Sequence, residues 1–198
     1  MSNLVKGFGI NDRSRPARVN TKRERTYGVW VNMLDRATNK FWEKYPTYQG
    51  TEISENFKHY SYFYDWCHKQ VGFSHDYNPT AWQLDKDILV KGNKLYSEDT
   101  CCFVPREINF LLLGNDANRG ECPIGVYYHK RTSNYMARYC AGNSKTKHIG
   151  YFDTKEEAFF AYKFAKEAYI KSVAEYWKDR LDFKVYAALI NYKIEITD

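Results

Sequence analysis

The sequence has little that would anchor it in a membrane or crosslink it. No apolar run approaches the roughly 20 residues needed to span a bilayer, and the first ten residues lack the charged start and apolar stretch of a signal peptide. We therefore expect a cytoplasmic protein without a membrane partner. The five cysteines are odd in number and include no Cys-x-x-Cys pair, which argues against a disulfide framework and a zinc knuckle and favours free thiols.

Aromatic residues and positive charge are abundant instead. Phe, Trp and Tyr make up 18% of the chain and all hydrophobic residues 43%, which is enough to bury a real core. The formal net charge is +6. A basic surface favours polyanionic partners, because its cations displace the counterions that condense on phosphates. The alternative is that this charge only keeps the chain soluble.

Residues 1–26 are predicted to be a basic arm. Within them, residues 11–25 carry six Arg or Lys side chains against two acidic ones, Asp12 and Glu24, and almost no apolar residues. A segment with so little apolar surface to bury is expected to stay flexible until it meets a partner. Two interpretations stay open, a phosphate-contacting arm and a solvated tail.

The next part of the chain, residues 27–112, is predicted to form helices first and short strands after them. Residues 27–70 carry two apolar stripes at helical spacing, one around Trp30 and Leu34 and one around Phe63, and such aromatic stripes are typical of a core. Residues 81–112 predict a short strand, a Gly-Asn turn, a second short strand and a helix.

The last third of the chain predicts a sheet followed by a helix. Residues 123–154 contain three strand-like segments separated by polar turns. Thr154 with Glu157 three residues later forms a capping box, which predicts a helix that runs on through Tyr169 and whose small and aromatic face lies close to the sheet. Residues 178–198 are expected to add a further helix or strand that packs on the rest.

Three segments of residues 123–177 carry a family resemblance: GVYYHKR, NYMARY and KHIGYFDTKEEAFFAYKFAKEAY. In this order they resemble the AP2 DNA-binding domain of plant transcription factors and of phage and bacterial homing nucleases. That family folds as a three-stranded antiparallel sheet on one helix, and the sheet enters the major groove of double-stranded DNA. The alternative is an ordinary domain with a solvated basic sheet face.

The resemblance also implies which side chains would contact DNA. The predicted contacts are Tyr127, His129, Lys130, Arg131, Arg138, Lys145, Lys147 and His148. Tyr127 and His129 take places where the plant domains carry arginine, so the sequence preference of those domains does not transfer.

A second resemblance covers residues 27–113. The segments TYGVWVNMLDRA, YPTYQGTEISENFKHYSYFYDW and LDKDILVKGNKLYSEDTCCFVPREIN resemble phage and bacterial HNH-type endonucleases, which often carry a C-terminal AP2 module. This implies a ββα-metal arrangement, in which a hairpin and the following helix bind one Mg²⁺ or Mn²⁺ for phosphodiester hydrolysis. The expected fold class is α+β, a helical ββα-metal-like module followed by a three-stranded sheet on one helix.

Four residues are the candidate catalytic residues: Asp85, Lys86, Asp87 and Asn109. The resemblance implies that Asp85 in the hairpin and Asn109 at the helix end bind the metal. Asp87 is two residues from Asp85, so on a strand both carboxylates would point to one face. Lys86 takes the position of the general-base histidine, and a protonated lysine is a poor base.

Two functions follow from these predictions. The first is a site-specific, homing-type DNA endonuclease that residues 123–177 deliver to double-stranded DNA. The second is a non-cleaving phage DNA-binding protein, a regulator or an anti-defence factor, in which residues 85–87 form a structural turn of a degenerate nuclease scaffold. Either would work in the host cytoplasm. A protein partner is possible but not indicated, since the aromatic helices are explained as core.

Overall fold

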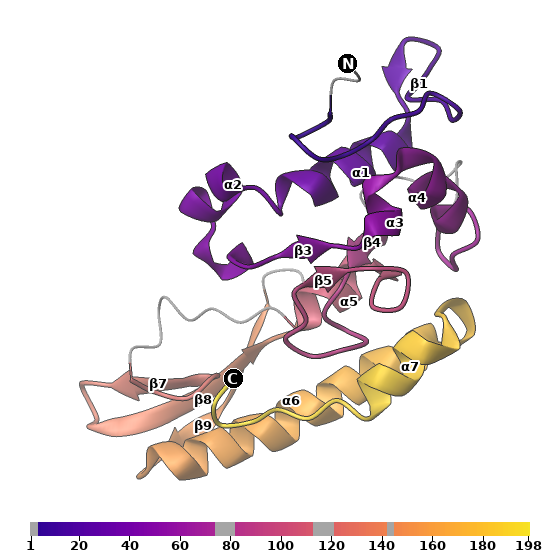
Figure 1. Ribbon diagram of the computed structural model, residues 1–198. Coiled ribbons are helices and arrows are strands. Elements are labelled where there is room, and N and C mark those ends of the chain that lie inside the picture. The colour runs from indigo at the N-terminus through magenta and orange to yellow at the C-terminus, as the bar shows by residue number, and fades with distance from the viewer. Residues whose placement is uncertain (1–3, 74–81, 113–120, 142–144) are drawn as a thin grey trace. The chain divides into compact units, whose positions relative to one another are not determined.

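The computed structural model describes residues 4–73, 82–112, 121–141 and 145–198 (Figure 1). The chain divides into two compact units, Met1–Pro105 and Arg106–Asp198. Helices and strands occur in both, so the predicted α+β class is confirmed. The boundary falls at Pro105, and the helix that follows it therefore belongs to the second unit, whereas the sequence predicted a first module that reaches residue 113.

The first unit contains several short helices among its described residues. They are α1 (Arg25–Asp35), α2 (Asn39–Lys44), η1 (Pro46–Tyr48), α3 (Glu55–Lys58) and α4 (Tyr60–Cys67). The predicted apolar stripes are confirmed, because Trp30 and Leu34 of α1 and Phe63 of α4 are completely buried. The indole nitrogen of Trp30 donates a hydrogen bond to the carbonyl of Phe57 at 2.8 Å, as a buried indole N–H requires.

The short strands of the first unit pair differently from the expected hairpin. Strand β4 (Trp82–Asp85) pairs antiparallel with β6 (Cys102–Pro105), and β3 (Glu52–Ile53) pairs parallel with β5 (Leu95–Tyr96). The predicted helix begins only after Pro105, at Arg106, because the hydroxyl of Thr100 accepts the Ser97 N–H and donates to the Leu95 carbonyl, which closes a turn before β6. All residues of β6 are buried, which suits its Phe and Val side chains.

The predicted flexible arm is attached to the first unit over residues 4–26. The backbone of Ile10 bonds to the chain at the start of α4. Asp12 accepts a hydrogen bond from Ser61 at 2.7 Å, and Arg15 forms a bidentate ion pair with Asp65, with both N···O distances 2.7 Å. In the structure, polar contacts hold this segment against the first unit although it has little apolar surface to bury. Residues 18–23 form a small hairpin of β1 (Arg18–Val19) and β2 (Lys22–Arg23).

The second unit is a three-stranded antiparallel sheet with a long helix on one face. The strands β7 (Val126–His129), β8 (Asn134–Cys140) and β9 (Thr146–Phe152) lie in this order, as predicted. Helix α6 (Lys155–Trp177) packs along the sheet (Figure 1), beside α5 (Arg106–Leu111), η3 (Lys178–Arg180) and α7 (Phe183–Ile190). The capping box is confirmed, with Thr154 and Glu157 exchanging hydrogen bonds at 3.2 and 3.3 Å.

Small residues bring the helix and the sheet close together. Val126 and Ala137 of the sheet and Ala158 of α6 are completely buried. Gly125 has a φ of +77°, and a Cβ atom there would lie 2.1 Å from the ring of Tyr162. The position therefore requires glycine both for its backbone and for its space.

A lysine is also buried between this helix and the sheet. Lys166 is 6% exposed, its ammonium donates to the carbonyl of Cys140 at 3.3 Å, and it lies 5.7 Å from the ring centroids of Tyr139 and Tyr169. Burial lowers the pKa of Lys166 to about 8, because it disfavours the charged form.

We expect Lys166 to make stability depend on pH. Below about pH 8 the lysine is protonated in the folded and unfolded chains, and folding carries the cost of burying its charge. Between about 8 and its ordinary pKa of 10.5 the folded chain loses the proton first, so the free energy of unfolding rises with pH. The gain is on the order of 3 kcal/mol. Urea denaturation across this range should show it for the natural chain and not for Lys166→Met, and the same pH dependence in both would contradict it.

Candidate functional site

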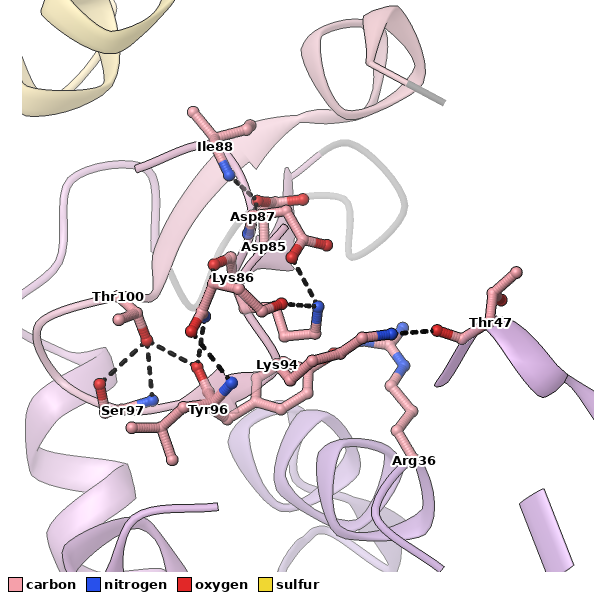
Figure 2. A network of polar contacts seen from close by, with 12 residues as sticks. Arg36, Thr47, Asp85, Lys86, Asp87, Ile88, Lys94, Tyr96, Ser97 and Thr100 are labelled. Atoms are coloured by element: carbon pink, nitrogen blue, oxygen red, sulfur yellow. Dashed lines mark hydrogen bonds and ion pairs between the residues drawn. The ribbon is translucent and has the colours of Figure 1, made fainter. Parts of the chain in front are cut away.

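The predicted catalytic residues of the first unit lie in a tightly bonded turn after β4 (Figure 2). Oδ1 of Asp85 accepts the backbone N–H groups of Asp87 at 2.7 Å and Ile88 at 2.8 Å. The ammonium of Lys86 donates to Oδ1 of Asp87 and to the carbonyl of Asn93, both at 2.6 Å. The Asn93 amide returns a hydrogen bond to the carbonyl of Lys86 at 2.8 Å.

Burial and nearby cations define the electrostatics of this turn. Lys86 is 6% exposed and its ammonium lies 5.8 Å from the ring centroid of Tyr96. The Tyr96 hydroxyl accepts a hydrogen bond from Arg36 at 3.0 Å. Burial raises the pKa of Asp85, and its two backbone hydrogen bonds oppose this rise in part. Asp85 is thus a perturbed carboxyl group, which is common at functional sites and also in structural networks.

The two carboxylates do not form the shared face expected of a cation site. Strand β4 ends at Asp85, so Asp87 follows in the turn and the alternation of a strand does not apply to it. Asp87 is also held by the ammonium of Lys86, where a divalent cation would have to bind. In the ranges that the structure describes, no cluster of three His, Cys, Asp or Glu side chains could hold a metal ion. Asp85 and Asp87 as placed here therefore do not form a ready pair of ligands for Mg²⁺ or Mn²⁺.

The predicted metal ligand Asn109 belongs to the second unit. It lies on α5, which starts directly after the division at Pro105. The pairing of Asp85 with Asn109 joins two units and stays a prediction.

We expect Lys86 to be needed for folding stability whatever its chemistry. Lys86→Met keeps the length of the side chain but leaves the Asn93 carbonyl without its donor, which should cost about 1–3 kcal/mol. Lys40→Met, at an exposed position of α2, is the control and should change stability by about 0.5 kcal/mol or less. Thermal unfolding measures both, and equal stability of the two variants would show that the buried ammonium is dispensable.

The second unit presents a continuous polar and aromatic surface on the sheet face away from α6. Pairing places Tyr127, Met136 and Tyr151 on one face, opposite to that of the buried Val126 and Ala137. We call this the outer face, and its members include Tyr127, His129, Met136, Arg138, Cys140, His148 and Tyr151.

Close ring contacts order the side chains of the outer face. The guanidinium of Arg138 lies 4.2 Å from the ring centroid of Tyr127. The ring of Tyr151 lies between two histidines, 5.3 Å from that of His129 and 4.9 Å from that of His148. The arrangement is an arginine stacked on one tyrosine beside a histidine–tyrosine–histidine row, and both parts can offer hydrogen-bond donors and flat surfaces to a ligand.

The predicted DNA contacts fall into two groups. Tyr127, His129, Arg138 and His148 lie on the outer face. The four cations lie elsewhere, at exposed positions around it: Lys130 and Arg131 in the turn after β7, Lys145 before β9, and Lys147 on β9 opposite Tyr139. Arg131 thus borders the outer face, whereas Lys147 pairs with Tyr139, whose ring contacts Tyr169 of α6, and so lies on the α6 side of the sheet.

Sequence reasoning missed Tyr151. Simple alternation puts His148 and Tyr151 on opposite faces, because they are three residues apart. The register shifts at Ala137, so that Ala137 pairs with Gly150 but Arg138 with His148, and this bulge brings both rings to the outer face. The one signal that could have found the bulge is Gly150, because an isolated glycine inside a strand often marks such an irregularity.

Comparison with known proteins does not identify the chain. No family model matches it, and neither a curated protein nor a solved structure is detectably similar. The structure adds that no helix among its described residues has both the length and the apolar character to cross a membrane.

Proposed function

We propose that this protein binds double-stranded DNA through the outer face of its β7–β9 sheet. The observation that carries the proposal is Arg138, stacked on Tyr127 at 4.2 Å in the middle strand of a sheet whose other face α6 covers. A small antiparallel sheet fits the major groove, where an arginine can donate two hydrogen bonds to one base edge. Stacking on a ring restricts the guanidinium and lowers the entropy lost on binding.

The charge around the outer face supports the same proposal. Lys130, Arg131 and Lys145 are exposed and lie at the ends of the strands, and Lys147 is exposed near the start of β9. Side chains in such positions would contact the phosphates on either side of the groove, which position a protein without selecting a sequence. The family resemblance favours the same assignment, an AP2-type module working on DNA in the cytoplasm of a host cell.

The binding proposal predicts a graded effect of substitutions at Arg138. We expect Arg138→Ala to weaken DNA binding about tenfold or more, and Arg138→Lys, which keeps the charge but not the planar fork, to recover only part of it. Fluorescence anisotropy with duplex DNA at several salt concentrations measures this. Lys171→Ala, on the exposed side of α6, is the control. Unchanged affinity of Arg138→Ala would exclude the outer face as the main contact.

Metal-dependent DNA cleavage is a second candidate function. Asp85 favours it, as a half-buried carboxyl group whose pKa burial raises, beside two further candidate residues. The bonded turn and the engaged Asp87 favour the alternative, a non-cleaving regulator or anti-defence factor.

A cleavage assay separates these two candidates. Plasmids carrying a wide set of sequences are incubated with the protein and Mg²⁺ or Mn²⁺. Asp85→Asn is the sharp variant, because its amide oxygen can still accept the turn hydrogen bonds while the charge is lost. If the protein is a nuclease, Asp85→Asn and Asn109→Ala abolish cutting. DNA that is shifted in a gel but stays intact assigns the non-cleaving function, and cutting that survives both substitutions rejects these residues as the site.

A further inference from the structure

The hairpin of residues 17–24, which we call the basic hairpin, is the second feature of the chain suited to a polyanion. Its two strands pair Arg18 with Arg23 and Val19 with Lys22, and all four residues are exposed. Figure 1 shows β1 at the edge of the first unit, extending beyond α1 and α4. The three cations Arg18, Lys22 and Arg23 are thus presented together on one short hairpin.

The cross-strand pairing is unfavourable in the absence of a partner. Arg18 and Arg23 lie directly opposite each other, and like charges in such a pair destabilise a hairpin. Glu24, next to Arg23 in the chain, is buried, and its carboxylate accepts hydrogen bonds from the Tyr27 N–H at 2.9 Å and the Thr26 hydroxyl at 3.1 Å. An anion between the two arginines would remove this repulsion.

The turn of the basic hairpin is held in a rarely populated conformation. Asn20 and Thr21 both have positive φ, 47° and 67°, which gives the tight two-residue turn of a hairpin. Asparagine tolerates this region, but a β-branched threonine does so rarely. Its hydroxyl donates to the Asn20 carbonyl at 2.6 Å, and Arg18 donates to the Thr21 carbonyl at 3.1 Å. Strain of this kind tends to persist where a segment has a function.

Contacts at its base fix the basic hairpin to the first unit. The Glu24 N–H donates to the Ala17 carbonyl at 3.0 Å, and the Tyr60 hydroxyl donates to the Pro16 carbonyl at 2.7 Å. The bidentate pair of Arg15 with Asp65 precedes them in the chain. The cations are therefore presented in place, and less conformational entropy is lost when they meet a ligand.

We propose that the basic hairpin is a second DNA contact, in which Arg18, Lys22 and Arg23 bind the phosphate backbone of double-stranded DNA. The inference rests on the proposed function, from which it takes double-stranded DNA as the partner. It concerns a different surface, which belongs to the first unit. The contact does not select a sequence, since charge alone recognises phosphates. It gives the chain two separate attachments to one duplex, and two linked contacts raise the overall affinity above that of either.

The test measures binding of the full-length protein to a duplex by fluorescence anisotropy over a range of salt concentrations. The hairpin variant is R18Q/K22Q/R23Q. Its matched control is K40Q/K44Q/K69Q, which removes three exposed cations from the same unit and changes the net charge equally. We expect the hairpin variant to bind at least about tenfold more weakly near 0.1 M salt. The negative slope of log K against log salt should become shallower by about 2 to 3, because up to three phosphate contacts are lost. The control should bind like the natural chain.

The melting temperature of the free protein tests the repulsion between Arg18 and Arg23 independently of DNA binding. Arg23→Gln removes the like-charge pair, so it should leave the melting temperature of the free protein unchanged or raise it while weakening DNA binding. A lower melting temperature together with unchanged binding would show that the arginine serves the fold and not a ligand.

The outcomes separate this inference from the proposed function. If the hairpin variant binds like its control while Arg138→Ala weakens binding, the inference is overturned and the outer face stands. If the hairpin variant weakens binding but Arg138→Ala does not, the inference stands and the outer face is excluded. If the natural chain binds no duplex at any salt concentration, both are overturned.

Discussion

The packing of α6 against the β7–β9 sheet is the interaction on which the second unit depends. Val126 and Ala137 meet a helix face of alanine and aromatic side chains, and Gly125 leaves the space that the ring of Tyr162 fills. This contact commits one face of the sheet to the core. The opposite face is left to the stacked Arg138 and the histidine–tyrosine row, so the same packing that stabilises the unit also presents its candidate binding surface.

In the first unit, the polar residues that the sequence singled out as catalytic make the hydrogen bonds of a turn. Its perturbed carboxyl group, Asp85, and its buried ammonium, Lys86, satisfy a turn that lacks regular backbone pairing. Buried polar groups must find partners, and here the partners are the side chain of Asp87 and the nearby backbone. A charge cluster that looks catalytic in a sequence can therefore be explained by the hydrogen-bonding needs of a turn, and the exposed cations of the basic hairpin are the better candidates for contact with a ligand.

Strongly periodic and capped elements were predictable from the sequence. The stripe around Trp30, the three strands and the Thr154–Glu157 capping box were predicted because each is decided by neighbours in the chain. Pairing and register were not, because they depend on distant residues. The partner of β4 is β6 across a turn at Thr100, and Tyr151 reaches the outer face through a bulge that alternation cannot reveal. The attachment of residues 4–26 was missed for the same reason, since Asp65 lies 50 residues from Arg15.

Cys140 allows a direct test of the outer face. It is exposed and lies on β8 two residues after Arg138, on the same face, whereas Cys67, Cys101 and Cys102 are buried. The measurement is the rate of maleimide alkylation of each cysteine, followed by peptide mass spectrometry, with and without saturating duplex DNA. If the outer face binds DNA, the duplex slows alkylation of Cys140 and leaves that of Cys122 unchanged. An unchanged rate at Cys140 in a protein that is demonstrably bound to DNA would contradict the account.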